Sequence, residues 1–435
     1  MNPINEMLAV SEKAFACVEA AQKRLSPVFQ RIEEVEESNF ARVLAAFSAE
    51  DVALRHFAPT TGYGYDDAGR DTLDRVFARA LQAQDALVRP QLTSGTHAIF
   101  TALSGMTEPG DTVVAATGKP YDTLEGAIGL SGNYPNSLAR MGVKFEPVKL
   151  TAQGKPDIPA VLDKIERTHA AILYVQRSRG YAWRDSLLPQ ADMQPLFAAV
   201  RAAAPRVAIL VDNCYGEFTS TLEPTAVGAD MIVGSLIKNP GGGLAPTGGY
   251  LAGKKEWIER IAQRMTVPGM GREVGSYAGS YRPFYQGLFM APHTTAQALK
   301  SAALFAELFQ GFGLPTMPAP DAIRSDIVQA VQFPTAEALI SFCRSIQKAS
   351  PVDSSAVPEP WDMPGYTSQV IMAAGAFVQG ASIELSADAP IRPPYTAYVQ
   401  GSLTYAHGKL AAAMALDALE KAGEINLSAS CVSLI

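Results

Sequence analysis

The stretch ADMIVGSLIKNPGGG, residues 229–243, decides the fold class, because an apolar run ends in Ser235 and Lys238 and passes directly into a glycine-rich turn. A short apolar run bounded by turn residues predicts a buried strand. Lys238 would leave the sheet at its carboxyl edge, where ligands bind in parallel sheets. There a lysine can have a depressed pKa and attack an aldehyde as a nucleophile. The alternative is an ordinary solvated lysine at the end of a strand.

Five more apolar runs surround this segment, and helix-like stretches such as residues 193–204 separate several of them. They are DTVVAAT (111–117), VKFEPVKL (143–150), AAILYVQ (170–176), VAILVDN (207–213) and GGYLAG (248–253). Strands that alternate with helices at this spacing are typical of βαβ units. We therefore expect an α/β fold with a mostly parallel central sheet and helices on both faces.

The length of 435 residues allows one large domain and one smaller domain, because single cores stop growing at about 250–300 residues. Apolar residues recur at helical spacing over residues 1–60, which predicts an N-terminal helical arm. Residues 61–295 are expected to form the large α/β domain, and residues 296–435 a small α+β domain. In the small domain we expect strands around 368–377 and 381–386, and a final helix over 408–423.

Composition narrows the class of partner and the cellular setting. The chain has 36 basic and 43 acidic side chains, a formal charge of −7, which provides no basic field for a nucleic acid and favours a small-molecule partner. The four cysteines lie far apart without a CxxC pair, which favours a reduced, cytoplasmic protein. No apolar run reaches the roughly 18–20 residues that span a bilayer. The histidines lack metal-ligand spacing, so no metal is expected.

Two further motifs would bring polar groups to the same edge of the sheet. Asp212 ends the apolar run before the strand of Lys238. A carboxylate there could bond a protonated pyridine nitrogen, or it could simply cap a turn. Ser94, Gly95 and Thr96 open a predicted helix, whose free N–H groups and positive dipole end suit a phosphate. Their alternative role is ordinary helix capping.

Aromatic and basic candidates follow two other predicted strands. Tyr121 comes after the run of residues 111–117, and its ring could stack on a flat cofactor or belong to the core. Arg177 and Arg179 follow the run of residues 170–176. They are candidates for contacting a cofactor's phenolic oxygen or the substrate, and their alternative role is to pair with surface acids.

These residue types, in this order, resemble the Cys/Met-metabolism group of fold-type I pyridoxal 5′-phosphate (PLP) enzymes, which includes cystathionine lyases and methionine γ-lyase. Within that group the sequence resembles more closely the methionine γ-lyase-like, or aluminium-resistance, proteins, which are also cystathionine β-lyase-like. The resemblance covers roughly residues 60–410. It is strongest in TGYGYDDAGRD (61–71), SGTHAI (94–99), VDNCYGEF (211–218), GSLIKNPGGG (234–243) and RPPYTAYVQGSLTYAHGKL (392–410).

The resemblance implies the aspartate aminotransferase fold and a site built around PLP. Lys238 would hold the cofactor as a Schiff base and act in catalysis, Asp212 would pair with the pyridine nitrogen, and Tyr121 would stack on the ring and assist catalysis. The residues that would hold the phosphate are Ser94, Gly95, Thr96 and Ser235.

The resemblance also implies contacts from a neighbouring subunit and with the substrate. In lyases of this group a Tyr/Arg pair from the neighbour completes the phosphate site, so Tyr63, Tyr65 or Arg70 is expected to bind there, although the usual Tyr-x-Arg spacing is absent. Arg392 lies where the family places the arginine that binds the substrate α-carboxylate, with a surface arginine as the alternative. Arg179 is a second candidate for the substrate.

The function implied is that of a PLP-dependent carbon–sulfur lyase, which acts on a sulfur-containing amino acid by β- or γ-elimination. A homodimer or homotetramer with sites at the subunit interface is expected. The alternatives are another PLP reaction, such as that of an aminotransferase, aldolase or decarboxylase, or a PLP-binding protein with little catalysis. A nucleotide binder without PLP is disfavoured, because GGYLAGKK (248–255) has Lys255 where a P-loop requires Ser or Thr.

Overall fold

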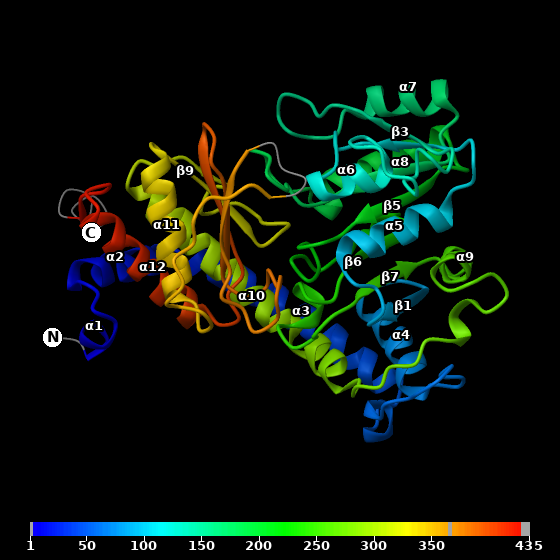
Figure 1. The fold of residues 1–435 in the computed structure, drawn as a ribbon, viewed down its shortest axis with the longest axis horizontal. Coiled ribbons are helices and arrows are strands. Elements are labelled where there is room, and N and C mark those ends of the chain that lie inside the picture. The colour runs from blue at the N-terminus through cyan, green and yellow to red at the C-terminus, as the bar shows by residue number, and fades with distance from the viewer. Residues whose placement is uncertain (1–2, 364–367, 428–435) are drawn as a thin grey trace. The chain divides into compact units, whose positions relative to one another are not determined.

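The computed structural model describes residues 3–363 and 368–427. Contacts divide the chain into two compact units: one is Glu37–Pro292, and the other combines Met1–Glu36 with His293–Ile435 (Figure 1). This division differs from the expected separate arm of residues 1–60, whose members are shared between the two units.

A seven-stranded sheet forms the centre of the unit Glu37–Pro292. Its order is β1-β7-β6-β5-β4-β2-β3, and of these strands β7 alone runs against the other six. All six predicted runs contain strands, so the expected α/β fold with a mostly parallel sheet is confirmed. β1 was not predicted, because its five residues begin and end in charged side chains. The bounds are β1 Asp85–Arg89, β2 Thr112–Ala115, β3 Lys144–Pro147, β4 Ile172–Gln176, β5 Ala208–Asp212, β6 Met231–Ser235 and β7 Gly249–Gly253.

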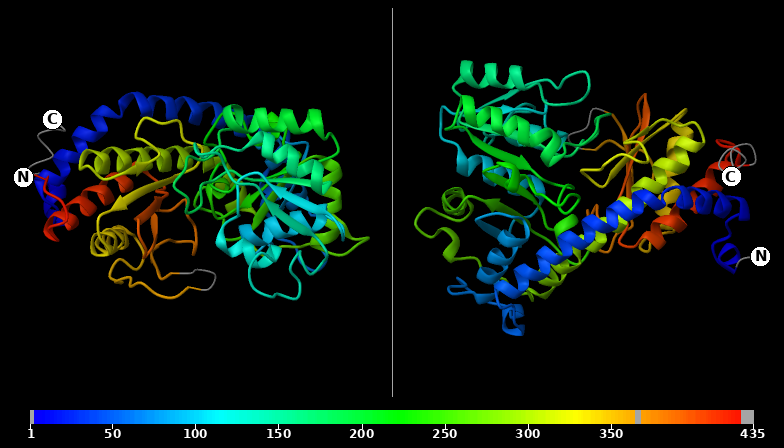
Figure 2. Two further views of the ribbon diagram at one scale, coloured as in Figure 1. Left: turned by 90° about the horizontal axis from the view of Figure 1, so that it is seen from above. Right: turned by 180° about the vertical axis from the view of Figure 1, so that it is seen from behind.

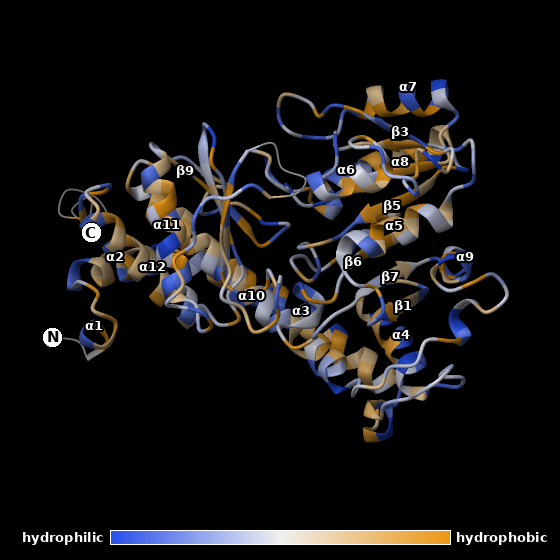
Figure 3. Cartoon of the chain, in the orientation of Figure 1, coloured by the Kyte–Doolittle hydropathy of each residue, from blue (hydrophilic) through white to orange (hydrophobic). Residues whose placement is uncertain are grey.

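Helices cover both faces of this sheet, as the side chains of β5 show. Ile209 and Val211 share a core with residues of α4, α7 and α8, whereas Ala208 and Leu210 share the opposite core with α5, α6 and α9. Successive strand side chains point to opposite faces, so a strand covered on both sides is apolar throughout. Figure 3 shows this hydrophobic colouring along β5. The helices are α4 Ala68–Ala80, α5 Gly95–Met106, α6 Asp122–Ile128, α7 Ile158–Thr168, α8 Gln194–Ala203 and α9 Lys255–Met265.

Two long helices, α3 (Ser26–Ala49) and α10 (Arg282–Gly311), contribute residues to both units. They lie side by side (Figure 2), with the ring centroids of Phe40 and Phe289 4.9 Å apart. Pro292 lies inside α10, at the boundary between the units. Short helical turns complete the description: η1 Leu54–Phe57, η2 Pro189–Met193, η3 Pro224–Val227, η4 Asn239–Gly241 and η5 Gly271–Glu273.

The second unit contains an antiparallel sheet of order β10-β11-β12-β9-β8, which confirms the smaller α+β part of the fold. The strand predicted at 381–386 is wrong, because these residues form a loop up to Ser386. In that loop the Glu384 carboxylate accepts hydrogen bonds from the backbone N–H groups of Phe377 and Val378 at 2.8 and 3.0 Å. The elements are α1 Pro3–Leu8, α2 Glu12–Arg24, β8 Thr316–Met317, β9 Val328–Phe333, α11 Ala336–Ala349, β10 Val370–Ala373, β11 Ser386–Pro390, β12 Tyr395–Gln400 and α12 Tyr405–Lys421.

Two of the cysteines, Cys214 and Cys343, have free thiols that are buried in the fold. Within the described ranges, no helix combines the length and apolarity needed to cross a membrane.

Candidate functional site

The predicted site residues follow the carboxyl ends of strands that run in one direction. Lys238 follows β6, Asp212 ends β5, Tyr121 follows β2, and the first turn of α5 follows β1. Because β7 is antiparallel to both β1 and β6, β1 has the direction of β6, and all four ends lie at one edge of the sheet. This edge is where ligands of α/β sheets bind.

Lys238 is half-buried in the loop between β6 and β7, and its Nζ lies 3.8 Å from the centroid of the Tyr215 ring. Burial lowers the pKa of Lys238, but the neighbouring acidic groups of Cys214, Tyr215 and Asp212 outweigh burial, so the pKa lies above its ordinary value. The depressed pKa expected for this lysine applies to a site that holds a cationic or phosphate-bearing ligand, so it stays a prediction. A ligand that delivers an aldehyde must act on an amine that this environment holds as a cation.

Asp212 is buried at the end of β5. Its Oδ1 accepts a hydrogen bond from the backbone N–H of Cys214 at 3.1 Å, and its Oδ2 accepts one from Tyr174 Oη at 3.4 Å. Burial raises the pKa of Asp212, and the positive charge of Lys238 opposes this rise. A carboxyl with this little stabilisation suits a ligand that brings a cationic N–H group.

Tyr121 is half-buried between β2 and α6. Its Oη donates a hydrogen bond to Thr96 Oγ1 at 2.9 Å, and its backbone N–H donates to Gln176 Oε1 at 3.0 Å. Burial, with the charges of Asp212 and Cys214, raises the pKa of Tyr121 well above its ordinary value, so the phenol stays protonated at neutral pH. The hydrogen bond places Tyr121 next to Thr96, as expected if both residues contact the same ligand.

The first turn of α5 and the end of β6 form a cradle of small and hydroxyl residues. Ser94 caps α5, and its Oγ accepts the backbone N–H of His97 at 3.1 Å. A Cβ on Gly95 would lie 3.3 Å from both Cys214 Sγ and Ser235 Cβ, so the chain approaches closely here. Hydroxyls, free N–H groups and a helix dipole are the donor set that a phosphate needs. The residues present therefore fit a phosphorylated cofactor.

Cys214 was not among the predicted site residues. It is buried beside Gly95, and burial raises the pKa of its thiol far above the ordinary value, so it is a neutral thiol. Gln176 was also missed, although it positions the backbone of Tyr121. A single Cys or Gln at the end of a strand does not form a recognisable sequence motif. Cys214 lies two residues after Asp212, and Gln176 directly precedes Arg177, and this nearness in sequence could have indicated them.

The two arginines after β4 differ. Arg177 is fully buried: Nη1 donates to Asn213 Oδ1 at 2.7 Å, Nη2 donates to Thr219 Oγ1 at 3.1 Å, and the side chain pairs with Glu223 at 3.4 Å. In the structure the Arg177 side chain therefore binds other buried side chains of the protein. Arg179 is also buried, and its contact with a substrate stays a prediction.

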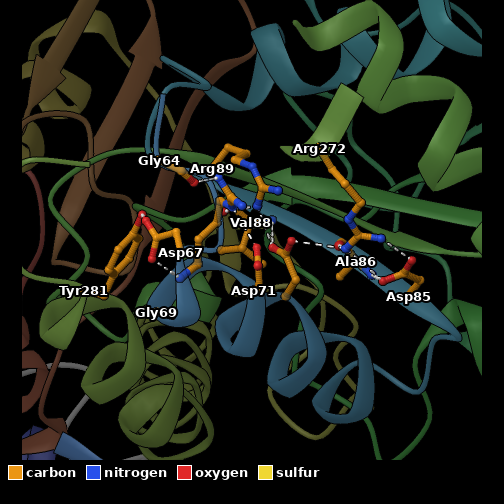
Figure 4. A network of polar contacts seen from close by, with 12 residues as sticks. Gly64, Asp67, Gly69, Asp71, Asp85, Ala86, Val88, Arg89, Arg272 and Tyr281 are labelled. Carbon is orange, nitrogen blue, oxygen red and sulfur yellow. Dashed lines mark hydrogen bonds and ion pairs between the residues drawn. The ribbon is translucent and has the colours of Figure 1, made fainter. Parts of the chain in front are cut away.

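The three candidates in the loop of residues 61–71 also differ in how far they are exposed. Tyr63 and Tyr65 are 66% and 59% exposed, and their rings stack with centroids 5.4 Å apart. Arg70, in contrast, is 1% exposed, and it donates to Gly64 O at 2.9 Å and to Asp71 Oδ1 at 2.8 Å. Figure 4 labels these two acceptor residues, Gly64 and Asp71. Arg70 therefore braces its own loop, while the tyrosines have the exposure that a contact with a neighbour requires.

Arg392 belongs to the second unit. It is exposed between β11 and β12, and its backbone N–H donates to Pro390 O at 2.9 Å. Its role toward a substrate stays a prediction.

Comparisons with known proteins agree with this geometry. The model of the methionine gamma-lyase family matches residues 14–420. The uncharacterized protein YnbB of Bacillus subtilis (strain 168) is 49% identical over 396 residues, which cover 91% of this chain and 94% of that protein. The crystal structure of a carbon-sulfur lyase involved in aluminum resistance from Clostridium novyi NT is 45% identical, with a TM-score of 0.91, over 95% of this chain and 97% of its own.

More distant similarity concerns the fold alone. The pyridoxal-5′-phosphate dependent protein YhfS from Escherichia coli is 18% identical, with a TM-score of 0.62, over 90% of this chain and 97% of its own. The family match, by contrast, spans nearly the whole chain, and the sequence identity to its relatives is high. The chain therefore belongs to the methionine gamma-lyase family.

Proposed function

We propose that this protein is a PLP-dependent carbon–sulfur lyase, which removes a β- or γ-substituent from a sulfur-containing amino acid. The observation that carries the proposal is the arrangement of Lys238, Asp212 and the first turn of α5 at one edge of the sheet. An amine, a buried carboxyl and a helix N-terminus match the aldehyde, the pyridine nitrogen and the phosphate of PLP. The carbon-sulfur lyase activity named for the Clostridium novyi relative supports the reaction class.

Each side chain would have a defined task. PLP, when bound, supplies an electron sink that weakens the Cα–H bond of an amino acid. Lys238 Nζ would hold the cofactor covalently and, once the substrate amine replaces it, would take the Cα proton as a base. Asp212 would accept the pyridine N–H. The Tyr121 ring would cover the cofactor, and its protonated Oη would assist proton transfer to the departing group.

The remaining candidates would bind the polar ends of cofactor and substrate. We infer that Arg392 and Arg179 bind the substrate α-carboxylate, a task that suits a planar guanidinium. Tyr65, rather than the buried Arg70, would reach a neighbouring phosphate site. The residues that would cradle the phosphate are Ser94, Gly95, Thr96 and Ser235.

An absorbance experiment tests the proposal. Wild type, Lys238→Ala and the exposed-lysine control Lys255→Ala are mixed with PLP and then with L-cystathionine, L-methionine or L-cysteine. The visible band of lysine-bound PLP is expected in wild type and control but not in Lys238→Ala, together with release of an oxo acid and ammonia. An equal band in Lys238→Ala would show that the lysine is misassigned. Amino-group transfer without sulfur release would exclude a lyase.

A further inference from the structure

A buried polar cluster next to the loops after β5 and β6 has no part in the proposed reaction. Its members Asn213, Glu217, Glu223 and Tyr250 are all fully buried. Tyr250 Oη donates a hydrogen bond to Glu217 Oε1 at 2.7 Å. Asn213 Nδ2 donates to Glu223 Oε2 at 3.0 Å and to Tyr250 Oη at 3.3 Å. The cluster therefore links the loop after β5 to β7.

Glu217 connects the loop that begins at Asp212 with the loop that carries Lys238. Its backbone carbonyl accepts a hydrogen bond at 3.0 Å from Nδ2 of Asn239, the residue directly after Lys238. Its carboxyl lies against Gly234 of β6, where a Cβ would come within 2.5 Å of Oε1. Any side chain at position 234 would thus displace the carboxyl. Asn239 Nδ2 also donates to the backbone carbonyl of Tyr215 at 2.9 Å, so the loop after Asp212 and the loop of Lys238 meet along Tyr215 and Glu217.

The surroundings of the Glu217 carboxyl favour its neutral form. Among the described residues, Oε2 has no hydrogen-bond partner, and Tyr250 is the side chain that donates to Oε1. A buried carboxylate whose only donors are Tyr250 Oη and its own backbone N–H, among the described residues, is costly, whereas a neutral acid in the same place is not. Gly234 of β6 brings no charge, and Arg177, which directly follows β4, is paired with Glu223.

We propose that Glu217 is a positioning residue, whose neutral carboxylic acid holds the Asp212 loop against Gly234 of β6, the strand that leads to Lys238, and against Tyr250 of β7, without placing a negative charge beside the lysine. The inference rests on the function proposed above. A charge on Glu217 would stabilise the protonated amine of Lys238 and so delay its attack on an aldehyde.

The electrostatics of the cluster agree with this geometry. Burial raises the pKa of Glu217 to about 8; the hydrogen bond from Tyr250 and the charge of Lys238 lower it, and the charge of Glu223 raises it. Cys214, on the same loop, is coupled to Glu217 as well, but it is neutral. These groups, with Arg177, are the ones that face the carboxyl.

Infrared spectroscopy of the protein without PLP tests the neutral state. The difference between wild type and Glu217→Gln should contain a band of a protonated carboxylic acid at pH 7, which is lost with a midpoint of about 8. In Tyr250→Phe the midpoint should move to higher pH, because the lost donor stabilised the charged form. Glu146→Gln, on the half-exposed Glu146 of β3, should leave the band unchanged. No band at neutral pH, or a Tyr250→Phe midpoint that stays or falls, would overturn the proposal.

PLP retention by the full-length chain tests the brace. Glu217→Ala removes it and leaves buried donors without a partner, so the apparent Kd for PLP should rise about ten-fold or more. Glu217→Gln keeps the shape and neutrality, and it should bind as wild type does at neutral pH. Unchanged binding by Glu217→Ala, or equal loss in both variants, would contradict the inference. If wild type fails to bind PLP through Lys238, the proposed function is wrong, while the infrared result still decides the state of Glu217.

Discussion

Glu217 holds its proton more tightly in the folded chain than in the unfolded one, because burial raises its pKa from 4.5 to about 8. Between these values the folded state binds more protons, so the stabilisation from this group is full below pH 4.5 and is lost as pH rises through 8. Glu217→Gln cannot ionise, so we expect it to lose less stability than wild type between about pH 5 and pH 8, by up to a few kcal/mol. Urea unfolding midpoints at the two pH values measure this difference. Equal losses would contradict the assignment.

Tyr121 allows the ring and the hydroxyl to be separated. Tyr121→Phe keeps the ring but removes Oη, which donates to Thr96 in the structure. We expect it to retain PLP and to lower the elimination rate by roughly 10²–10⁴-fold, the range for a positioned acid or base. Tyr121→Ala should weaken PLP binding too. Steady-state rates and absorbance titrations distinguish these effects, and a full rate in Tyr121→Phe would remove the hydroxyl from the mechanism.

For single residues, the sequence predicted the position of a side chain where a chemically reactive or polar residue comes at the end of a predicted strand. The placement of Lys238, Asp212 and Tyr121 at one edge of the sheet could be predicted, because each follows or ends an apolar run in the sequence. The structure brings the ends of these strands to one edge. The internal use of Arg177 could not, since its partners come from a loop on the next strand. Glu217 could not either, because burial is a property of the packed sheet.

The junction of α4 and β1 depends on one buried carboxylate. Asp74 of α4 accepts hydrogen bonds at 2.7 Å from both the backbone N–H of Val88 and Nη1 of Arg89, and it pairs with Arg272 at 3.2 Å. Its partners Val88, Arg89 and Arg272 are labelled in Figure 4. Asp74→Asn would leave the 1%-exposed Arg89 without its counter-charge, at an expected cost of about 3–5 kcal/mol.

A control for that prediction lies on α7. Asp163 pairs with Arg167, and the two side chains are 57% and 66% exposed, so Asp163→Asn should cost less than about 1 kcal/mol. Denaturant unfolding of both variants measures the two costs. Equal losses of unfolding free energy in the two variants would mean that burial does not make the Asp74 ion pair more important for stability.

Elements were predictable where apolar runs were long and uninterrupted. β5 and β6 are buried on both faces, and each is free of polar side chains up to its last residue, Asp212 in β5 and Ser235 in β6. β1 escaped prediction because Asp85 and Arg89, its charged ends, are held by ion pairs from outside the strand. The apolar residues of 381–386 suggested a strand, but the Glu384 carboxylate takes backbone N–H groups of its own loop instead.

For the whole molecule, PLP should act as a stabilising ligand. A ligand that binds only the folded state adds about 2.7 kcal/mol when present at 100 times its Kd. We therefore expect PLP to raise the Tm of wild type and Lys255→Ala, and to raise that of Lys238→Ala less. Thermal scans at fixed protein concentration measure this. No increase in wild type would mean that PLP does not bind the folded chain.

Two compact parts and a parallel sheet could be anticipated from length and alternation. The grouping of the N-terminal helix with the C-terminal part could not. It depends on Val18 of α2 sharing one core with Leu416 of α12, residues at opposite ends of the chain. A sequence pattern cannot predict such a contact. Apolar residues at helical spacing show that a helix has an apolar face, but they do not show which element covers that face.

That discontinuity has a consequence for synthesis on the ribosome. Residues 37–292 are continuous, so the sheet with Lys238 and Asp212 can form while the chain is still being translated, as domains that emerge early do. α2 emerges before the sheet, but its core partner α12 is translated after the sheet. The apolar face of α2 must therefore wait uncovered through most of translation. We expect chaperones to engage the nascent chain at this helix, and to leave it once the final helix has been made.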